Sequence, residues 1–463
     1  MLTKLRIKNF KAWKDTGDIR LAPLTVLFGT NSSGKSSLGH LLLALKQTAA
    51  SADRRRALHT GDDSSLIDVG TFVECLHGHD RQAQLEFTLD WSLPVARQVT
   101  NPFEPTQVYS GTHLRLTSTL AASAQDQPFV RRVHYELHNA DGDAHALSAT
   151  LTQSADGKVQ LQAQPYRLVH ADGRKWPLEP PEKFYRISDR SIARYKNADF
   201  LADFALEIER SLAGLTYLGP LRDHPHRTYG WSGNTPEDVG AKGEYAIACI
   251  LAAEAVKRKL NRGYRKKTQP FAEFIAGWLV DLGVIESFRV RATAAGRKDY
   301  EVKVKTRGGL TEVGLPDVGF GVSQVLPALV QAFYCPEGST VWMEQPEIHL
   351  HPQVQAELAD MFISAIGSYE HGRPRNVQLI IETHSEHLLN RLQRRVAEGA
   401  ITPSQIAIYF AKANPNGAEL EELAVNEFGD ITNWPDNFFG DEMADIVART
   451  EAASRLRTQR GAP

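Results

Sequence analysis

A nine-residue stretch rich in glycine and serine, residues 29–37, constrains this chain more than any other. Its sequence, GTNSSGKSS, satisfies the pattern G-x-x-x-x-G-K-[S/T]. It follows the apolar segment LTVLF and precedes the apolar run LGHLLLALK, which is typical of a buried helix. A glycine-rich turn that contains a lysine also arises by chance, but the strand before it and the helix after it favour a phosphate-binding loop. The sequence therefore predicts an α/β nucleotide-binding unit.

Each position of this loop has an expected task. Gly29 and Gly34 allow backbone angles with which successive N–H groups surround a phosphate, and the dipole of the following helix favours the negative charge. Lys35 is expected to place its charge on the terminal phosphates, and Ser36 to ligate Mg²⁺. The expected nucleotide-binding residues of the loop are Gly29, Thr30, Asn31, Ser32, Ser33, Gly34, Lys35, Ser36 and Ser37.

Three segments of the last third carry further candidates. The strand-like TVWME ends in Glu344, from which a carboxylate can reach a magnesium ion through a water. The buried segment LIIET is followed by His384, which at a strand end can hydrogen-bond a terminal phosphate. Gly319, Gly321 and Ser323 open an apolar helix, so N–H groups and a hydroxyl gather at its N-terminus, and Gly321, Ser323 and the adjacent Gln324 are candidate nucleotide-binding residues. The alternatives are an exposed charge, a capping and packing histidine, and an ordinary helix N-cap.

The residue after Glu344 is a glutamine, Gln345. Phosphoryl transfer needs positioning, charge neutralisation and an oriented water more than it needs a strong base. An amide cannot take a proton, but it can orient water. Glu347 is the nearest acid that could act as the base instead, and it could equally cap the helix that starts near Pro352 or pair with a basic residue. The candidate catalytic residues are Lys35, Glu344, Gln345, Glu347 and His384, and the candidate metal ligands are Ser36 and Glu344.

Composition limits the classes of protein to which the chain can belong. A chain of 463 residues is too long for one ordinary core and suggests two or three lobes, and 42% hydrophobic and 23% charged residues are typical of a globular protein. No run reaches the roughly 18 apolar residues of a membrane-spanning helix, and three distant cysteines lack metal or redox spacing, so we expect a cytoplasmic protein that does not contact membranes. A net charge of −2 excludes a globally basic nucleic-acid binder, but not a local basic patch.

The organisation along the chain divides into four expected regions. Residues 1–80 form the N-terminal half of an ATPase lobe, and residues 301–463 form its C-terminal half. Segments such as QLEFTLDW and RRVHYELH alternate apolar and polar residues, so residues 81–180 are expected to be rich in antiparallel strands. Residues 181–300 are expected to form a helical insertion that contains a basic stretch.

The order of these motifs resembles that of ABC-class ATPase heads. The shared features are Asn31 in the phosphate loop, the Gly/Ser/Gln segment, the acidic strand end and the late histidine. EQPEIHLHP and ETHSEHLLNRL are more closely similar to the stand-alone AAA/OLD-like branch, which is related to the SMC and double-strand-break repair ATPases. Many members of that branch are encoded with effector proteins in bacterial antiphage systems such as Septu. LGPLRDHPHR, DVGFGVSQVLP and NWPDNFF also resemble this branch, whereas the strand-rich segment matches it only in general position.

The resemblance implies a fold, a pair of ligands and an assembly. The implied fold is an α/β, ABC-type ATPase head split by a strand-rich and a helical insertion, and the implied ligands are ATP and Mg²⁺. Glu344 would complete the metal site and His384 would sense the γ-phosphate. Ser323 would contact the nucleotide of a second subunit, which makes the active unit a homodimer or a higher homo-oligomer. His351 stands where the family's loop between subunits usually has aspartate.

These implications lead to an expected function. Glutamine at the position of Gln345 slows hydrolysis in the resembling enzymes, so we expect a slow ATPase that dimerises around ATP. It would act as a sensor or scaffold for a separate effector, a nuclease or toxin, in antiphage defence. The alternative is an ATP-dependent DNA-repair or DNA-binding factor without a toxic partner. A nuclease of the OLD type is not expected, because too few residues follow His384, and the absence of sustained heptads predicts a compact chain.

Four further features leave alternatives open. The basic stretch VKRKLNRGYRKK, residues 256–267, could contact DNA phosphates or form the solvated face and last turn of a helix. His349 and His351 could join a metal site or serve packing and subunit contact. Arg222 and Arg227 could be fixed against nucleotide or a partner, or could form surface salt bridges. In the tail, NWPDNFFGDE could dock on its own lobe or present Trp434, Phe438 and Phe439 to a partner.

Overall fold

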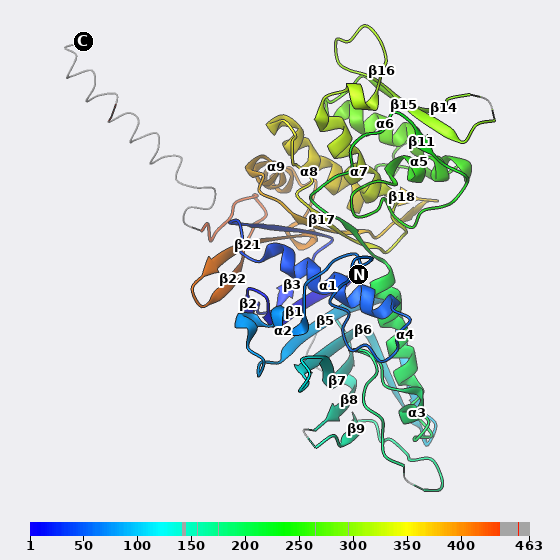
Figure 1. Ribbon diagram of the computed structural model, residues 1–463, viewed down its shortest axis with the longest axis vertical. Coiled ribbons are helices and arrows are strands. Elements are labelled where there is room, and N and C mark those ends of the chain that lie inside the picture. The colour runs from blue at the N-terminus through cyan, green and yellow to red at the C-terminus, as the bar shows by residue number, and fades with distance from the viewer. Residues whose placement is uncertain are drawn as a thin grey trace.

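The chain folds as a mixed α/β protein, which confirms the expected class (Figure 1). The structure is a computed structural model that describes residues 1–140, 145–154, 156–174, 176–263, 265–294 and 296–435, together with residue 452. In these ranges, no helix is long and apolar enough to span a membrane.

The helices and strands account for most of the periodic segments of the sequence. The helices of the described ranges are α1 (Lys35–Ala50), α2 (Phe72–Cys75), α3 (Asp189–Ile192), α4 (Phe200–Ala213), α5 (Ala246–Ala255), α6 (Phe271–Asp281), α7 (Phe320–Tyr334), α8 (Pro352–Ile366) and α9 (Glu386–Ala397). The longer strands are β1 (Leu2–Phe10), β4 (Leu24–Gly29), β5 (Leu85–Asn101), β6 (Glu104–Ala122), β7 (Pro128–His138), β8 (His145–Gln153), β9 (Val159–Gln164), β10 (Leu215–Leu218), β14 (Ser287–Ala292), β15 (Asp299–Lys305), β17 (Thr340–Glu344), β20 (Gln378–Glu382), β21 (Ile406–Asn414) and β22 (Gly417–Glu422). The short strands are β2 (Trp13–Asp15), β3 (Ile19–Arg20), β11 (Tyr229–Gly230), β12 (Lys259–Leu260), β13 (Gln269–Pro270), β16 (Val313–Gly314), β18 (Tyr369–Glu370) and β19 (Arg373–Pro374).

A six-stranded sheet in the order β10-β17-β20-β4-β21-β22 organises the candidate site. Its first five strands are parallel, and β22 pairs antiparallel with β21. Parallel strands are covered on both faces, which is why segments such as TVWME and QLIIE are almost continuously apolar. The carboxyl ends of β4, β17 and β20 lie at one edge of the sheet. The phosphate loop and the two acidic strand ends therefore meet there.

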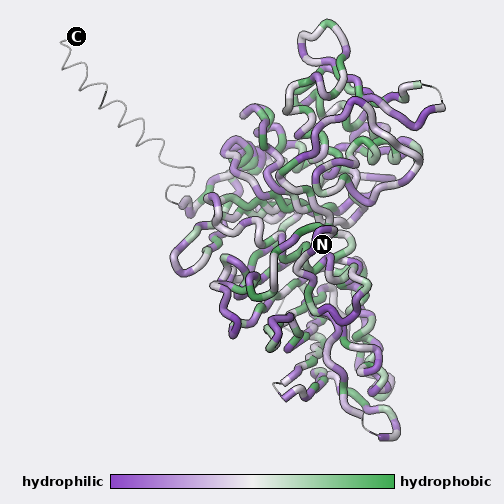
Figure 2. The backbone as a smooth tube through the Cα atoms, viewed as in Figure 1, coloured by the Kyte–Doolittle hydropathy of each residue, from purple (hydrophilic) through white to green (hydrophobic). Residues whose placement is uncertain are grey.

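Alternate residues of the sheet strands enter two separate hydrophobic cores. Leu27, Trp342 and Ile380 belong to the core that contains α1, α4 and the strand-rich region. Val26 and Met343 belong to the core that contains α5 to α9. Figure 1 shows this division, with α5–α9 on one side of the central strands and β5–β9 on the other. Hydrophobic and hydrophilic stretches alternate along the chain in both halves (Figure 2).

A second, antiparallel sheet of eight strands follows the order β2-β1-β5-β6-β7-β8-β9, with β3 paired to β1. Strands β5–β9 lie in the range expected to be rich in strands. The sheet begins outside that range, because β1 pairs with β5 from Leu2 to Lys8. The N-terminal strand, which the sequence assigns to the ATPase lobe, thus joins the lobe to the strand-rich region.

The range 181–300, expected to form a helical insertion, also contributes a strand to the six-stranded sheet. It contains helices α3 to α6, but β10 within it forms the outer strand of the six-stranded sheet and pairs in parallel with β17. β10 is short and fully buried, with the sequence LTYL. Four residues are too few for a period to separate a strand from the glycine- and proline-rich loop that follows.

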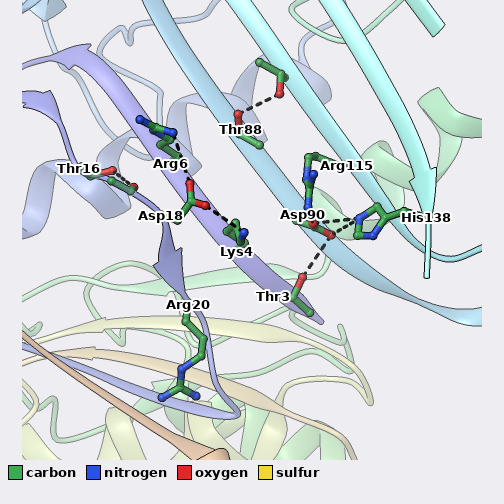
Figure 3. Close-up of polar contacts among 12 residues, drawn as sticks. Thr3, Lys4, Arg6, Thr16, Asp18, Arg20, Thr88, Asp90, Arg115 and His138 are labelled. Carbon is green, nitrogen blue, oxygen red and sulfur yellow. Dashed lines mark hydrogen bonds and ion pairs between the residues drawn. The ribbon is translucent and has the colours of Figure 1, made fainter. Parts of the chain in front are cut away.

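A buried ionic cluster connects four strands of the antiparallel sheet (Figure 3). Asp90 on β5 is 3% exposed and accepts hydrogen bonds from Arg115 on β6, with Nη2 at 2.7 Å. His138 Nε2 on β7 lies 3.1 Å from Asp90 Oδ2, and Thr3 Oγ1 on β1 donates to Oδ1 at 3.3 Å. The hydrogen bond to Asp90 raises the pKa of His138. The cluster thus ties the N-terminal strand to the centre of this sheet.

This arrangement predicts a pH-dependent contribution to stability. Because the folded state holds the His138 proton more tightly than the unfolded state, the His138–Asp90 contribution is fully present below pH ~6.5 and is lost as the pH rises through the raised folded pKa. Replacing His138 by glutamine is expected to cost about 1–2 kcal/mol at pH 6 and less at pH 9. Urea unfolding at both pH values measures this, with His387→Gln on the exposed face of α9 as the control. An equal cost at both pH values would contradict it.

Candidate phosphate-binding site

The loop between β4 and α1 has backbone angles that only glycine adopts easily. Gly29 ends β4 with φ +148°, and a Cβ there would lie 2.3 Å from the carbonyl oxygen of Ala411. Gly34 precedes α1 with φ +90°. The indole N–H of Trp13 donates to the Gly34 carbonyl at 3.0 Å and to Ser37 Oγ at 2.9 Å, which supports the loop from the N-terminal strands. The sequence shows no sign of this support from Trp13.

Lys35, at the start of α1, lies across the inside of the loop. Its Nζ donates to the carbonyl oxygens of Gly29 at 3.1 Å and Thr30 at 2.9 Å, and the residue is 4% exposed. Burial lowers the pKa of this ammonium, against the attraction of Glu382 and Glu347. Its hydrogen-bond acceptors in the described residues are neutral carbonyl oxygens, which an anionic phosphate oxygen could replace.

Three buried carboxyl groups face this loop. Glu344 ends β17 and Glu382 ends β20, and the two residues are register partners in the parallel sheet. Ser36 Oγ donates to Glu382 Oε1 at 3.0 Å, and Tyr217 Oη donates to Glu344 Oε1 at 3.2 Å. Glu347 Oε1 accepts the backbone N–H of His384 at 2.8 Å. Sequence reasoning missed Glu382, although its place at the end of LIIE matches that of Glu344 at the end of TVWME.

The electrostatics of the three carboxyl groups favour a cation. Burial raises the pKa of Glu344 to about 7 and raises those of Glu347 and Glu382 as well. The second oxygens of Glu347 and Glu382, both Oε2 atoms, are buried and accept no hydrogen bond from the described residues. Hard divalent cations prefer carboxylate and hydroxyl oxygens, so these groups fit Mg²⁺. In the described ranges, no group of three or more His, Cys, Asp or Glu side chains could hold a metal ion without other ligands, so phosphate oxygens would have to supply them.

The chain turns sharply after β17, and this turn excludes one of the alternatives for Glu347, the cap of the following helix. Gln345 has φ +45°, and its N–H donates to the Glu382 carbonyl oxygen at 2.8 Å. Glu347 is directed to the backbone after β20 and does not cap α8. The N-cap of that helix is His351, whose side chain accepts the N–H of Gln353. His351 therefore caps α8 and has a structural task. The side chain of His384, by contrast, is exposed.

The Gly/Ser/Gln segment lies apart from this group within one chain. Ser323 and Gln324 are buried in the first turns of α7, with 7% and 4% exposure. Ser323 lines a separate pocket together with His224 and His226. A Cβ on Gly321 would lie 3.5 Å from Leu350, so the start of α7 is close to the loop that follows Glu347. Lys35, Ser36, Glu344, Glu347 and the backbone of His384 thus come together, and the Ser323 segment does not join them.

The basic stretch 256–267 differs from its expected helical form. Helix α5 ends at Ala255, and the stretch continues as a loop and the short strand β12, so the interpretation as a last helical turn is wrong. Arg258 is half-buried and pairs with Glu370 at 2.8 Å. The guanidinium of Arg262 lies 4.1 Å from the ring centre of Trp278. Arginines that pack inside the fold cannot be told from exposed ones by composition. Tyr264 of this stretch is outside the described residues.

For Arg227 and for the aromatic residues of the tail, the structure tests only part of the expectation. Arg227 forms an exposed ion pair with Asp317 at 2.9 Å, the surface salt bridge that was one of its alternatives. Trp434 is 48% exposed, and Phe438 and Phe439 of the same tail lie outside the described residues.

Comparison with known proteins identifies the family. Residues 24–390 match the family described as "AAA domain, putative AbiEii toxin, Type IV TA system", and residues 401–448 match one described as "Protein of unknown function (DUF3696)". No match was found among curated proteins.

Several solved structures are similar at low identity. An SMC head bound to the C-winged helix domain of ScpA has a TM-score of 0.43 at 11% identity, over 92% of this chain and 98% of that chain. The SMC head domain from Thermotoga maritima has a TM-score of 0.39 at 10% identity, over 91% and 98%. An SMC head with an extended coiled coil, bound to the C-terminal domain of ScpA derived from Pyrococcus furiosus, has a TM-score of 0.38 at 11% identity, over 91% and 96%.

The family match spans most of the chain and includes the phosphate loop, both acidic strand ends and His384. The chain therefore belongs to this AAA-domain family and is a nucleotide-binding protein of the ATPase type.

Proposed function

We propose that the chain binds Mg–ATP between the phosphate loop and the acidic strand ends, and that it hydrolyses ATP slowly. The observation that carries this proposal is the meeting of Lys35, the Ser36–Glu382 contact and Glu344 at one edge of the parallel sheet. Buried cationic and carboxylate groups side by side complement the two charges of a metal–phosphate complex.

The loop residues have defined tasks in this proposal. The backbone N–H groups of residues 29–37 bind the phosphates, and Lys35 Nζ exchanges its carbonyl partners for the terminal phosphates. Ser36, Glu344 and Glu382 are the residues that would hold Mg²⁺. When bound, this ion would neutralise negative charge on the phosphoryl group that is transferred.

The slow rate follows from the residues next to the terminal phosphate. Gln345 orients the attacking water through its amide but does not accept a proton. Glu347 is an inefficient substitute, because its Oε1 atom is already engaged by the His384 N–H. His384 contacts the γ-phosphate from the exposed end of β20. ATP binding, more than turnover, is then the event to which a partner responds.

We further propose an ATP-dependent homodimer or higher homo-oligomer that serves as sensor or scaffold for a separate effector protein, a nuclease or toxin, in bacterial antiphage defence. Support comes from the resemblance of EQPEIHLHP and ETHSEHLLNRL to the AAA/OLD-like branch and from the family description, which names a toxin–antitoxin system. In the dimer, Gly321, Ser323 and Gln324 face the nucleotide of the second subunit. The DNA-binding alternative has less support, because Arg258 and Arg262 of the basic stretch are used within the fold.

Light scattering tests ligand and assembly together. With Mg–ATP we expect the molar mass to double, and with Mg–ADP or with ATP plus a chelator we expect it to remain that of the ligand-free chain. The binding of radiolabelled ATP is measured in the same samples. An unchanged mass at full occupancy would contradict dimerisation, and the absence of bound ATP would contradict the proposed function as a whole.

A further inference from the structure

Arg222 reaches the candidate site from the outer strand of the sheet. It lies in the loop after β10, and Leu218 at the end of β10 is the register partner of Met343 on β17. The two strands are parallel, so the β10 loop leaves the sheet at the edge where Glu344 stands. One N–H group of Arg222, on Nη2, donates to the Glu344 carbonyl oxygen at 3.2 Å. The loop after β10 thus brings a cation next to the acidic end of β17.

Two nitrogen atoms of this guanidinium make no hydrogen bond within the described part of the chain. The Nε and Nη1 atoms of Arg222 are buried and have no hydrogen-bond partner among the described residues. Burial lowers the pKa of Arg222 to about 10, against the attraction of Tyr217, Glu344 and Glu347. Buried donors are nearly always paired, and a guanidinium with free donors is costly. A residue kept in this state points to an acceptor outside the chain.

Two other arginines show that the fold pairs such groups where their purpose is structural. Arg375 is 1% exposed and donates from Nη1 to Ser368 Oγ and from Nη2 to the Cys335 carbonyl oxygen, and its Nε, which makes no hydrogen bond, lies 3.6 Å from Glu370 Oε2. Arg227, five residues after Arg222 in the same loop, pairs with Asp317. Arg222 differs from both, because its Nε and Nη1 atoms are buried without a hydrogen-bond partner and no carboxylate pairs with it among the described residues.

The unpaired atoms of the site are of two complementary kinds. On one side are the free N–H groups of Arg222, and on the other are the free Oε2 atoms of Glu347 and Glu382. Direct ion pairs would satisfy both kinds, yet the fold keeps them apart. A metal–phosphate complex satisfies both, because its cation suits the carboxylate oxygens and its phosphate oxygens suit a guanidinium.

We propose that Arg222 donates its free N–H groups to the terminal phosphate of the nucleotide and so distinguishes ATP from ADP. This inference rests on the proposed function, because it needs a nucleotide in the loop. Lys35 approaches the phosphates from the loop side, whereas Arg222 approaches from the side of Glu344. Arg222 is thereby a phosphate-contacting residue of the same subunit.

Equilibrium binding of Mg–ATP and Mg–ADP to the full chain tests this inference. Arg222→Met keeps most of the apolar stem and removes the donors, so it is expected to weaken ATP binding roughly tenfold or more and to leave ADP binding within about twofold. Arg222→Lys restores the charge and is expected to recover part of the preference for ATP. Arg227→Met, which loses only the surface pair, serves as the matched control. Thermal unfolding of each ligand-free variant reports any general loss of structure.

The outcomes separate this inference from the proposed function. Equal weakening of ATP and ADP, or an unchanged ratio of their affinities, would overturn the role of Arg222, since bracing of the Glu344 backbone affects both nucleotides alike. A wild-type chain that binds neither nucleotide would overturn the proposed function itself. Selective loss of ATP affinity with an unchanged melting temperature would support the inference.

Discussion

Replacement of Lys35 by methionine is expected to weaken Mg–ATP binding by at least about 100-fold, the largest effect of a single change in this chain. The ammonium is buried inside the phosphate loop, and its present partners are two neutral carbonyl oxygens. A phosphate is a far better partner, and each charge-assisted hydrogen bond contributes about 1.5–3 kcal/mol. Methionine fills a similar volume but cannot donate.

Isothermal titration of Mg–ATP into both proteins measures this effect. Lys14→Met, which removes an exposed lysine outside the loop, is the matched control and is expected to bind like the wild type. Since Lys35→Met also removes the cost of burying a charge, its melting temperature without nucleotide is expected to be no lower than that of the wild type. Retention of ATP affinity by Lys35→Met would show that the loop is not the nucleotide site.

A pair of substitutions at residues 345 and 347 is expected to identify what limits hydrolysis. Gln345→Glu supplies a carboxylate next to Glu344 and is expected to raise turnover by about tenfold or more, since a positioned base typically contributes 10²–10⁴-fold. Glu347→Gln is expected to change turnover by less than about threefold, because Oε1 of Glu347 serves the His384 backbone. Steady-state phosphate release at saturating Mg–ATP measures both rates.

The opposite pattern would assign the base to Glu347. A fall of about 100-fold in Glu347→Gln, with no gain in Gln345→Glu, would mean that the buried Oε2 atom of Glu347 takes the proton. Gln82→Glu adds a charge at an exposed position far along the chain from the site, and it controls for the change of net charge. The ATP affinity of every variant is measured as well, because equal affinities show that a change in turnover arises in the hydrolysis step.

Much of the α/β core was predictable because its periods are strong and its strands are buried on both faces. The segment TVWME forms the expected strand as β17, and the helix expected to start near Pro352 is α8, which begins at that residue. The phosphate loop was predictable from spacing alone, because glycine, lysine and serine each meet a local requirement there. In these segments the local sequence and the tertiary structure favour the same conformation.

Other parts of the site depend on contacts between distant segments. Tyr217 meets Glu344 only because β10 and β17 pair, and Trp13 meets Gly34 only because the N-terminal strands cross the loop. In the sequence, Glu382 cannot be distinguished from other polar residues that precede a helix. Its contact with Ser36 depends on the strand order β17-β20-β4. The prediction of a last helical turn for the basic stretch was wrong for a similar reason. Arg258 is partly buried because it pairs with Glu370, which lies more than a hundred residues away in the sequence.

The steady-state turnover of the wild-type chain tests the central claim, that this protein holds ATP more than it consumes it. At saturating Mg–ATP, with active-site concentration fixed by nucleotide titration, we expect about one turnover per second or fewer, below the typical enzyme value of about ten. Turnover of tens per second would contradict the claim and would show that the protein hydrolyses ATP rapidly.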